Sequence, residues 1–426
     1  MSRLRLPKMP TLIAEAATLL SGQMLAQVIT VAAYFILTRI YTPDDYCLFN
    51  IFYSYIEVLV IVSTCKYEVA VVAADSDAEA RQVSRGALTI NTAVSLLLLT
   101  VALALVLTHS LPGNFSQLGP IALLIPPMVF FCGTSRIYSF LFNRAHRYRQ
   151  IALSETVNAA SGSLLKILFG LLRMHTAGMP LGTVLGQMAA NINYRLRLKQ
   201  LPFMQGTAPA AVTAKQALLK HRNYPLYVAP KDLLTSFSAN LPFLWLALYF
   251  QQAEVGLFGL ALTFTFRPAN ILNGAFERAL YARVAERVRQ RQSIARTIRR
   301  FLLILNAIAI PAAIAAWFVA EPLFTFLFGS QWVGTGIYVQ ALLPWILVML
   351  STMSLMFIPN VFGTQRTEFL FGLVLLALRI AACLAGLHAG SFILAIRLFA
   401  AASAAVCLAL LAWYLWQVCR YERSLR

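Results

Sequence analysis

Apolar stretches of about 20 residues recur from one end of the chain to the other, separated by short charged segments. A helix of that length crosses the hydrocarbon core of a bilayer. The chain is 59% hydrophobic and only 12% charged, whereas a soluble domain carries about 25% charged residues. Such a composition cannot provide a water-soluble surface, so the sequence predicts an all-α integral membrane protein.

The apolar runs between charge clusters predict about twelve transmembrane helices. They cover residues 12–38, 47–73, 86–108, 118–141, 151–172, 177–196, 226–250, 255–277, 299–320, 333–359, 367–387 and 389–418. Basic segments resist translocation and therefore set the orientation. With the N-terminus inside, most of the 35 basic residues lie in inner segments, and the outer side holds only Arg39 and Arg173. The pattern predicts a multi-pass protein with both termini in the cytoplasm.

The net charge of +19 would suggest nucleic acid as a partner of a soluble protein. Here the positive charge follows the inner loops, above all residues 278–300. We therefore expect membrane lipids, and not nucleic acid, to contact these residues. The six cysteines and five histidines lack the spacing of metal ligands, so no metal site and no cofactor are predicted.

A short pattern occurs once in each half of the chain. Residues 41–49 read YTPDDYCLF and residues 250–258 read FQQAEVGLF, at an offset of 209 residues. Six predicted spans separate the two copies, which indicates a parallel repeat of the kind found in transporters. We expect an N-terminal six-helix lobe at 1–198, a cytoplasmic inter-lobe loop at 199–224 and a C-terminal six-helix lobe at 225–426.

Several stretches together resemble the bacterial polysaccharide flippases, the O-antigen exporters of the Wzx type. They are residues 37–50, 66–70, 76–80, 224–225, 241–242, 256–258, 268 and 328–332. Their order and spacing carry the resemblance, which runs from residue 12 to beyond residue 365. Cys47 is a departure, because the family usually has glycine there.

The resemblance implies the MATE-like fold of the MOP superfamily, in which two six-helix lobes work by alternating access. Helices one, two, seven and eight would line the central cavity. The implied function is a flippase of the bacterial inner membrane that moves an undecaprenyl-diphosphate-linked oligosaccharide, such as an O-antigen or exopolysaccharide repeat unit. Glycan polymerase and assembly machinery are expected partners, and a proton or sodium ion is the expected coupling ion.

Ionisable side chains inside predicted spans are energetically costly and therefore mark candidate functional sites. We expect a cationic, substrate-binding cavity that attracts the diphosphate or an acidic sugar, formed by Lys66, Lys231, Arg267 and Arg136. Two acidic residues are expected to pair with these cations or to carry the coupling ion, Glu57 and Asp232. The alternative for each residue is a structural ion pair. Glu68 is expected to snorkel to the interface. The resemblance implies that the span of Arg379 lies nearer the exterior of its lobe.

Two other functions fit parts of the pattern. A MATE-type exporter of small amphiphilic molecules, coupled to an ion gradient, has the same scaffold, but the cationic surplus within the spans favours an anionic substrate. A membrane enzyme needs a sizeable outer loop, and the predicted outer loops are short, so no catalytic residue and no enzyme activity are predicted. Asp75-Ser76-Asp77 and Gly182-xxx-Gly186 are interpreted as a helix cap and a helix-packing motif.

Overall fold

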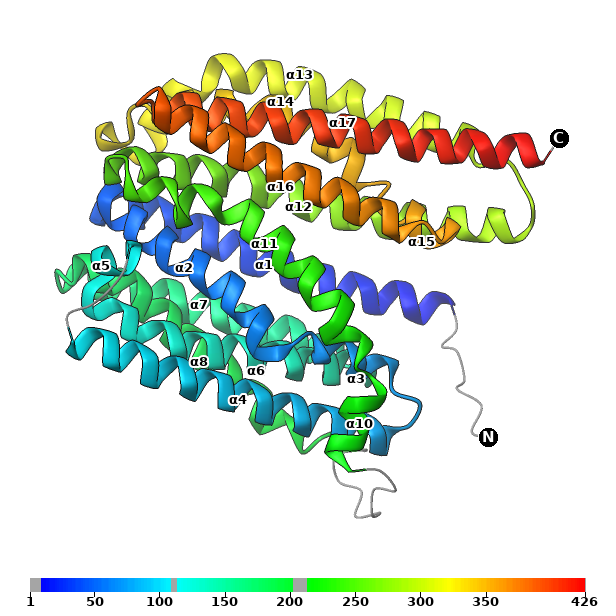
Figure 1. Ribbon diagram of the computed structural model, residues 1–426, viewed down its shortest axis with the longest axis horizontal. Coiled ribbons are helices and arrows are strands. Elements are labelled where there is room, and N and C mark those ends of the chain that lie inside the picture. Colours follow the sequence, from blue (N-terminus) through cyan, green and yellow to red (C-terminus); the bar gives the residue numbers. More distant parts are fainter. Residues whose placement is uncertain (1–8, 109–112, 202–212, 426) are drawn as a thin grey trace. The chain divides into compact units, whose positions relative to one another are not determined.

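The computed structural model describes residues 9–108, 113–201 and 213–425 (Figure 1). These residues are helical almost throughout, and no strand occurs among them. An α-helix satisfies its backbone hydrogen bonds within one segment, as the hydrocarbon core of a membrane requires. The predicted all-α fold class is confirmed. The expectations that concern the first eight residues and residues 202–212 of the inter-lobe loop lie outside the described part.

The chain folds into two compact units, residues 1–236 and residues 237–426. The helices of the first unit are α1 (Met9–Ile40), α2 (Pro43–Thr64), α3 (Tyr67–Ala73), α4 (Asp77–Leu107), α5 (Asn114–Leu118), α6 (Ile125–Arg144), α7 (Tyr148–Leu171), α8 (His175–Leu198) and α10 (Ala214–Lys220). Helix α11 (Ala229–Leu244) begins in the first unit and ends in the second. The second unit continues with α12 (Gln252–Arg289), α13 (Ala295–Phe328), α14 (Thr335–Met353), α15 (Ile358–Phe362), α16 (Gln365–His388) and α17 (Phe392–Ser424). The short α10 belongs to the first unit because it packs against α4.

Each predicted span coincides with one or more of these helices. Within the described residues, eight helical segments are long and apolar enough to cross a membrane. Helices α7, α8, α11 and α12 are not among them. Helix α11 has only 16 residues, and α12 contains residues whose side chains lie outside the described part of the chain. Helices α7 and α8 contain Ser, Asn and Gln side chains that face other helices, and these lower the hydropathy of a span without exposing it to water.

Four predicted spans are not single continuous α-helices, and the structure corrects the sequence here. Residues 118–141 comprise the end of α5, a 3₁₀ helix and most of α6. Residues 47–73 divide into α2 and α3. Residues 226–250 comprise the end of a π-helical turn, α11 and a 3₁₀ turn, and residues 333–359 divide into α14 and α15. Hydropathy counts apolar side chains and does not register the backbone direction, so an apolar run predicts a span but not its breaks.

The repeated pattern marks the start of a helix in both units. Thr42 caps α2: its hydroxyl accepts a hydrogen bond from the Asp45 backbone N–H at 3.3 Å, and the Asp45 carboxylate accepts one from the Thr42 backbone N–H at 3.0 Å. Pro43 occupies the first helical position, where its missing N–H costs nothing. Helix α12 begins at Gln252, at the same 209-residue offset from Pro43 as the sequence pattern.

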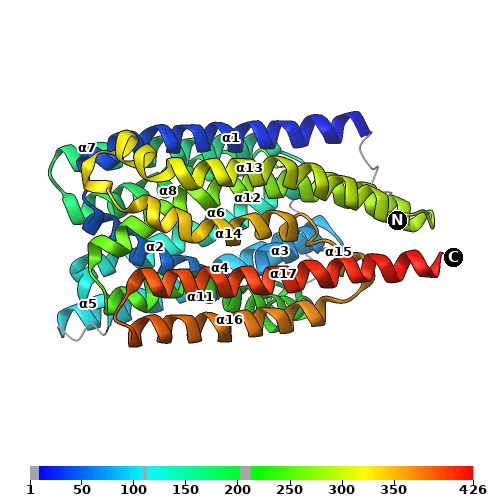
Figure 2. The same ribbon diagram turned by 90° about the horizontal axis from the view of Figure 1, so that it is seen from above.

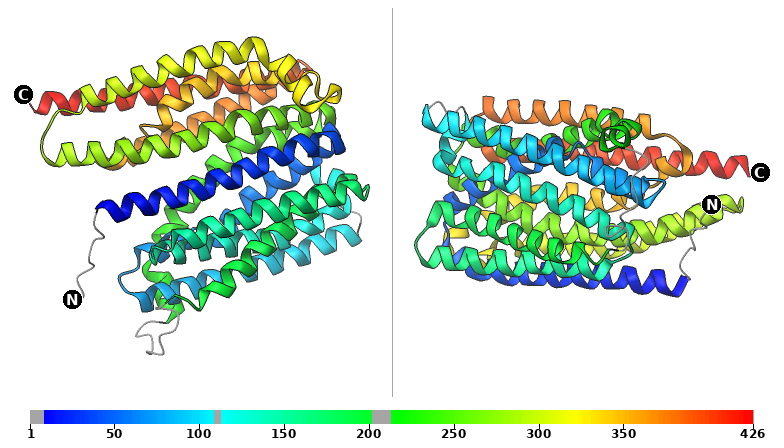
Figure 3. Two further views of the ribbon diagram at one scale, coloured as in Figure 1. Left: turned by 180° about the vertical axis from the view of Figure 1, so that it is seen from behind. Right: turned by 90° about the horizontal axis from the view of Figure 1, so that it is seen from below.

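Small residues allow close packing within the first unit, where α1 lies along α7 and α7 lies along α8 (Figure 3). A Cβ atom placed on Gly186 of α8 would stand 2.6 Å from the Gly162 Cα atom of α7. In the second unit, α16 and α17 run side by side (Figure 2). There, a Cβ on Gly386 would stand 2.5 Å from the Ala395 Cα atom.

We expect Gly186→Ala to destabilise the protein by about 1–3 kcal/mol, because the new methyl group meets backbone and the helices must separate. Gly162→Ala is the matched control: its nearest neighbour would be the Gly182 carbonyl oxygen at 3.6 Å, an ordinary contact. Alanine at that position is expected to be neutral or to stabilise α7 by up to about 1 kcal/mol. Thermal unfolding of the purified variants in detergent measures both effects. Equal losses in the two variants would contradict this account of the packing.

Candidate functional site

The break between α2 and α3 positions the first candidate cation. Cys65 and Lys66 both have left-handed backbone conformations, with φ of 47° and 59°. Non-glycine residues rarely adopt this conformation, and two in succession turn the chain sharply within an apolar run. The turn ends α2 and starts α3, so Lys66 lies where backbone groups of two helix ends are available.

Lys66 is paired with an acidic residue that is distant in the sequence. Its Nζ atom lies 2.7 Å from Oδ2 of Asp232, in the first turn of α11. The Lys66 side chain is 16% exposed, whereas that of Asp232 is 36% exposed. The structure thus brings together two of the residues expected at the site. Because Asp232 is accessible, an anion can approach the Lys66 ammonium group by taking the place of this carboxylate.

Glu68 lies on the other side of Lys66 and does not snorkel, contrary to the expectation. It is 1% exposed, and its Oε1 atom lies 4.0 Å from the Lys66 Nζ atom. Its Oε2 atom has no hydrogen-bond partner among the described residues. A buried carboxylate is costly unless a cation compensates it. Lys66 therefore lies next to two carboxylates, the buried one of Glu68 and the more exposed one of Asp232.

The remaining candidate cations occupy different elements. Lys231 is half-buried and precedes Asp232 in the first turn of α11. Arg267 lies in the middle of α12, beside Pro268, and its side chain lies outside the described residues. Arg136 is half-buried on α6. Glu57 of α2 and Arg136 both interact electrostatically with the Cys132 thiol, so these two charges lie in the same part of the first unit.

Arg136 lines a small polar pocket among α6, α7 and α8, with a volume of about 210 Å³. Glu155 of α7 lines the same pocket, and its carboxylate is hydrogen-bonded to Gln23 of α1. Asn158 donates to Gln187 at 2.8 Å, and Gln187 donates in turn to the Ser135 hydroxyl at 2.7 Å. The pocket therefore contains a carboxylate and a cation within a connected set of amides and hydroxyls.

Glu155 is the functional candidate that the sequence analysis missed. It lies four residues into the predicted span 151–172, with Asn158 one helical turn further on. A carboxylate and an amide at i and i+3 lie on one face of a helix, and an intramembrane carboxylate is itself a functional signal.

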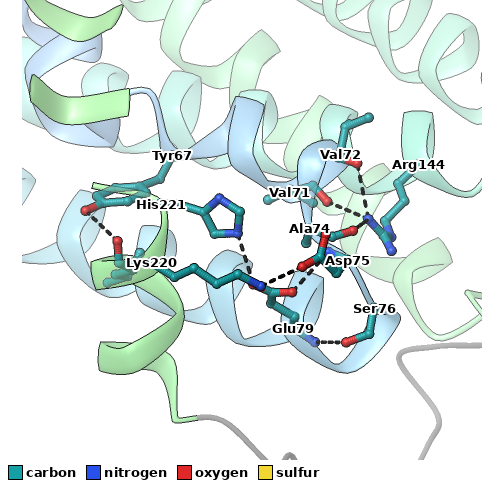
Figure 4. A network of polar contacts seen from close by, with 11 residues as sticks. Tyr67, Val71, Val72, Ala74, Asp75, Ser76, Glu79, Arg144, Lys220 and His221 are labelled. Carbon is teal, nitrogen blue, oxygen red and sulfur yellow. Dashed lines mark hydrogen bonds and ion pairs between the residues drawn. The ribbon is translucent and has the colours of Figure 1, made fainter. Parts of the chain in front are cut away.

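A second polar network joins the C-terminal ends of α3, α6 and α10 and the N-terminal end of α4 (Figure 4). Ser76 caps α4, since its hydroxyl accepts the Glu79 backbone N–H at 3.1 Å, as expected for Asp75-Ser76-Asp77. Arg144, the last residue of α6, donates to the carbonyl oxygens of Val71, Val72 and Ala74 at 3.1, 3.2 and 2.8 Å. It also contacts the Asp77 carboxylate at 3.0 Å. Arg144 thus satisfies the carbonyl groups left open at the end of α3.

Helix α10 is attached to this network through its last residue, Lys220, and through the residue that follows it, His221. The Lys220 Nζ atom lies 2.8 Å from the Asp75 carboxylate and 2.7 Å from that of Glu79, and His221 Nε2 lies 3.1 Å from Glu79 Oε1 (Figure 4). The hydrogen bond from Lys220 lowers the pKa of Asp75, and the hydrogen bond to Asp75 raises the pKa of Lys220. A lowered acid pKa and a raised ammonium pKa keep both groups charged across neutral pH.

Arg379 of α16 is buried within the second unit. It is 4% exposed, and its guanidinium donates to the Ser403 hydroxyl at 2.9 Å and to the Ser238 hydroxyl at 3.0 Å. The guanidinium also stacks on the rings of Phe399 and Trp345, with its carbon 4.4 and 5.0 Å from their centres. This arrangement joins α11, α14, α16 and α17 within the second unit.

Comparison with solved structures identifies the fold. Lipid II flippase MurJ in an inward closed conformation superimposes with a TM-score of 0.72 at 11% identity, over 93% of this chain and 86% of that one. The MATE multidrug transporter DinF-BH gives 0.70 at 14% identity over 97% and 96%. An inward-facing MATE transporter of the MOP superfamily gives 0.69 at 12% identity over 93% and 96%. The expected MATE-like fold is confirmed.

Sequence comparison identifies the family. The succinoglycan biosynthesis transport protein ExoT of Rhizobium meliloti (strain 1021) is 22% identical over 211 residues. This match spans 50% of the chain and 40% of that relative. The profile of a family described as polysaccharide biosynthesis protein matches residues 36–336, which is more than half of the chain. The chain is therefore a multi-pass membrane protein that belongs to the polysaccharide biosynthesis protein family.

Proposed function

We propose that this protein is a flippase that moves an undecaprenyl-diphosphate-linked oligosaccharide, an O-antigen or exopolysaccharide repeat unit, across the bacterial inner membrane. The observation that carries the proposal is the Lys66–Asp232 ion pair at the break between α2 and α3, in a chain of a polysaccharide biosynthesis family. The break places the Lys66 ammonium group beside a partly exposed carboxylate. The lipid II flippase MurJ has a similar fold, which supports the proposal that this protein also moves a lipid-linked glycan.

The physical problem of such transport is the glycan and its diphosphate, because the lipid tail is already soluble in the bilayer. Each buried hydroxyl without a partner costs roughly 2–7 kcal/mol, so several sugars make unassisted crossing negligible. A groove with polar and cationic walls removes that cost. In the proposed cycle the diphosphate displaces Asp232 from Lys66, while Lys231, Arg267 and Arg136 supply further positive charge. No bond is broken, so no nucleophile is needed.

The return of the Asp232 carboxylate to Lys66 promotes release of the substrate. When Asp232 pairs again with Lys66, it competes with the bound diphosphate and favours its departure. We propose alternating access between a six-helix lobe at 1–198 and a six-helix lobe at 225–426, with both termini in the cytoplasm. Glu57, Asp232 and Glu155 are the carboxylates proposed for a coupling proton or sodium ion.

Flipping of a labelled lipid-diphosphate oligosaccharide in proteoliposomes tests the proposal. Wild type is expected to flip the lipid, and Arg267→Ala and Lys231→Ala are each expected to slow flipping at least about tenfold, the effect of losing one hydrogen bond to a charged group. Insertion and thermal unfolding of each variant are measured alongside as controls. Repeating the assay with a proton or a sodium gradient identifies the coupling ion.

The same assay separates the flippase from its alternative. If no lipid-linked glycan is flipped while small amphiphilic cations leave the vesicles in response to an ion gradient, the protein is a MATE-type exporter. That result would discard the proposed cationic cavity as well. The MATE structures among the fold matches make this comparison necessary.

A further inference from the structure

An apolar groove runs along α13 in the second unit. Helices α12 and α13 each pack along α14, and aromatic pairs such as Phe264–Phe328 and Phe276–Phe301 join them near the two ends of α13. A groove of about 720 Å³ lies between them with α14 as its floor. Its lining extends along α13 from Phe301 to Phe328, a rise of about 40 Å. The hydrocarbon core of a bilayer is about 30 Å thick, so the groove is long enough to follow a lipid tail through a full leaflet and beyond.

Five alanines form the middle of this groove on α13. They are Ala309, Ala312, Ala313, Ala316 and Ala320. In membrane proteins, a stripe of small residues usually lets a second helix approach closely. Here no helix of the described residues fills the space over the stripe, and larger side chains such as Ile308 and Leu323 line the groove beside the alanines. The volume lies in the range of ligand pockets rather than of packing defects.

A positive charge stands at one end of the groove. Arg300 precedes Ile304 by four residues and Ile308 by eight, so it lies on the helix face that lines the groove. Arg300 is exposed, as are its neighbours Arg296 and Arg299. An apolar groove with a basic end complements a lipid that has a long tail and an anionic headgroup.

We propose that this groove binds the polyisoprenyl chain of the lipid-linked substrate, with its diphosphate beside Arg300. The inference rests on the proposed function for the substrate class and adds the place of the tail. An isoprenoid chain carries a methyl branch at every fourth chain carbon, and such branches need a notched wall, whereas a straight acyl chain does not. The alanine stripe between bulky residues supplies that wall. Holding the tail would keep the diphosphate at the membrane surface, ready for transfer.

A photoreactive polyisoprenyl diphosphate in lipid nanodiscs tests the groove, with mapping of the labelled peptides. We expect labelling of α13 in the wild type, and at least about a tenfold loss in Ala316→Trp, because the indole fills the groove. Ala315→Trp is the matched control: Ala315 is exposed and lies outside the groove lining, so labelling should remain. Unlabelled polyisoprenyl diphosphate should compete, and phosphatidylglycerol should not. Arg300→Gln should weaken competition by the diphosphate about fivefold and leave that by the neutral polyisoprenol unchanged.

The outcomes distinguish this inference from the proposed function. Equal labelling of the two tryptophan variants, or equal competition by phosphatidylglycerol, would show an ordinary acyl-lipid surface and overturn the inference. Unimpaired flipping by Ala316→Trp would overturn it while leaving the flippase function intact. Specific labelling of α13 in a wild type that flips no lipid would support the groove and remove the proposed function.

Discussion

Lys66→Asn is expected to slow flipping of the lipid-linked oligosaccharide about tenfold to a hundredfold, the effect of losing a hydrogen bond to a charged group. Asparagine removes the positive charge but tolerates the left-handed backbone that Lys66 adopts, with φ of 59°. The helix break should therefore survive the substitution. The measurement is the initial flipping rate in proteoliposomes, together with the affinity for the diphosphate lipid.

Asp232→Asn is the matched partner of this variant, since it breaks the same 2.7 Å ion pair from the other side. It leaves the Lys66 ammonium unpaired by Asp232, so the diphosphate lipid should bind more tightly and be released more slowly. Opposite effects of the two variants on affinity are the decisive result. If both variants lose thermal stability equally and neither alters lipid affinity, the pair is structural and Lys66 does not bind substrate.

Arg144→Ala is expected to destabilise the first unit by about 2–4 kcal/mol, the largest stability effect we expect of any single substitution here. The substitution removes three hydrogen bonds to carbonyl oxygens at the end of α3 and the contact with Asp77. Arg144→Lys should recover only part of the loss, because one ammonium group cannot span the positions that a planar guanidinium reaches. Thermal unfolding in detergent at low and high salt provides the measurement.

Arg149→Ala is the control for this prediction. Arg149 is exposed near the start of α7, and an isolated surface charge contributes little. We expect a change within about 0.5 kcal/mol. A loss in Arg144→Ala no larger than this would mean that water replaces the guanidinium at the α3 carbonyl groups, and that the network in Figure 4 contributes no rigidity.

Much of the fold could be predicted from the sequence, because an apolar run of sufficient length has few alternatives in a membrane. The helix starts were also readable where polar caps mark them, as at Thr42-Pro43 and at Ser76. The break at Cys65–Lys66 could not be predicted, because neither residue is a glycine or a proline, which usually mark a change of backbone direction. Local hydrogen bonds, such as that from the Cys65 N–H to the Ile61 carbonyl oxygen, and the distant contact of Lys66 with Asp232 hold that turn.

The candidate site was partly predictable for a related reason. A charge inside an apolar span is conspicuous, so Lys66 and Asp232 could be singled out, but their contact joins residues of different helices and leaves no local pattern. The burial of Arg379 depends on two serines and two aromatic rings from other helices, and none of these is conspicuous in the sequence. Sequence reasoning therefore finds costly residues more readily than the partners that compensate them.

Helix α12 has 38 residues and a length of about 57 Å, nearly twice the thickness of the hydrocarbon core. Its basic end and the start of α13 must therefore stand clear of the bilayer. Glu422 of α17 holds this tip, because its carboxylate accepts the backbone N–H groups of Ile294 and Ala295 at 2.7 and 2.9 Å. A chain with little mass outside the membrane is difficult to align in single-particle images. This braced hairpin is a natural epitope for an antibody fragment that would serve as a fiducial mark.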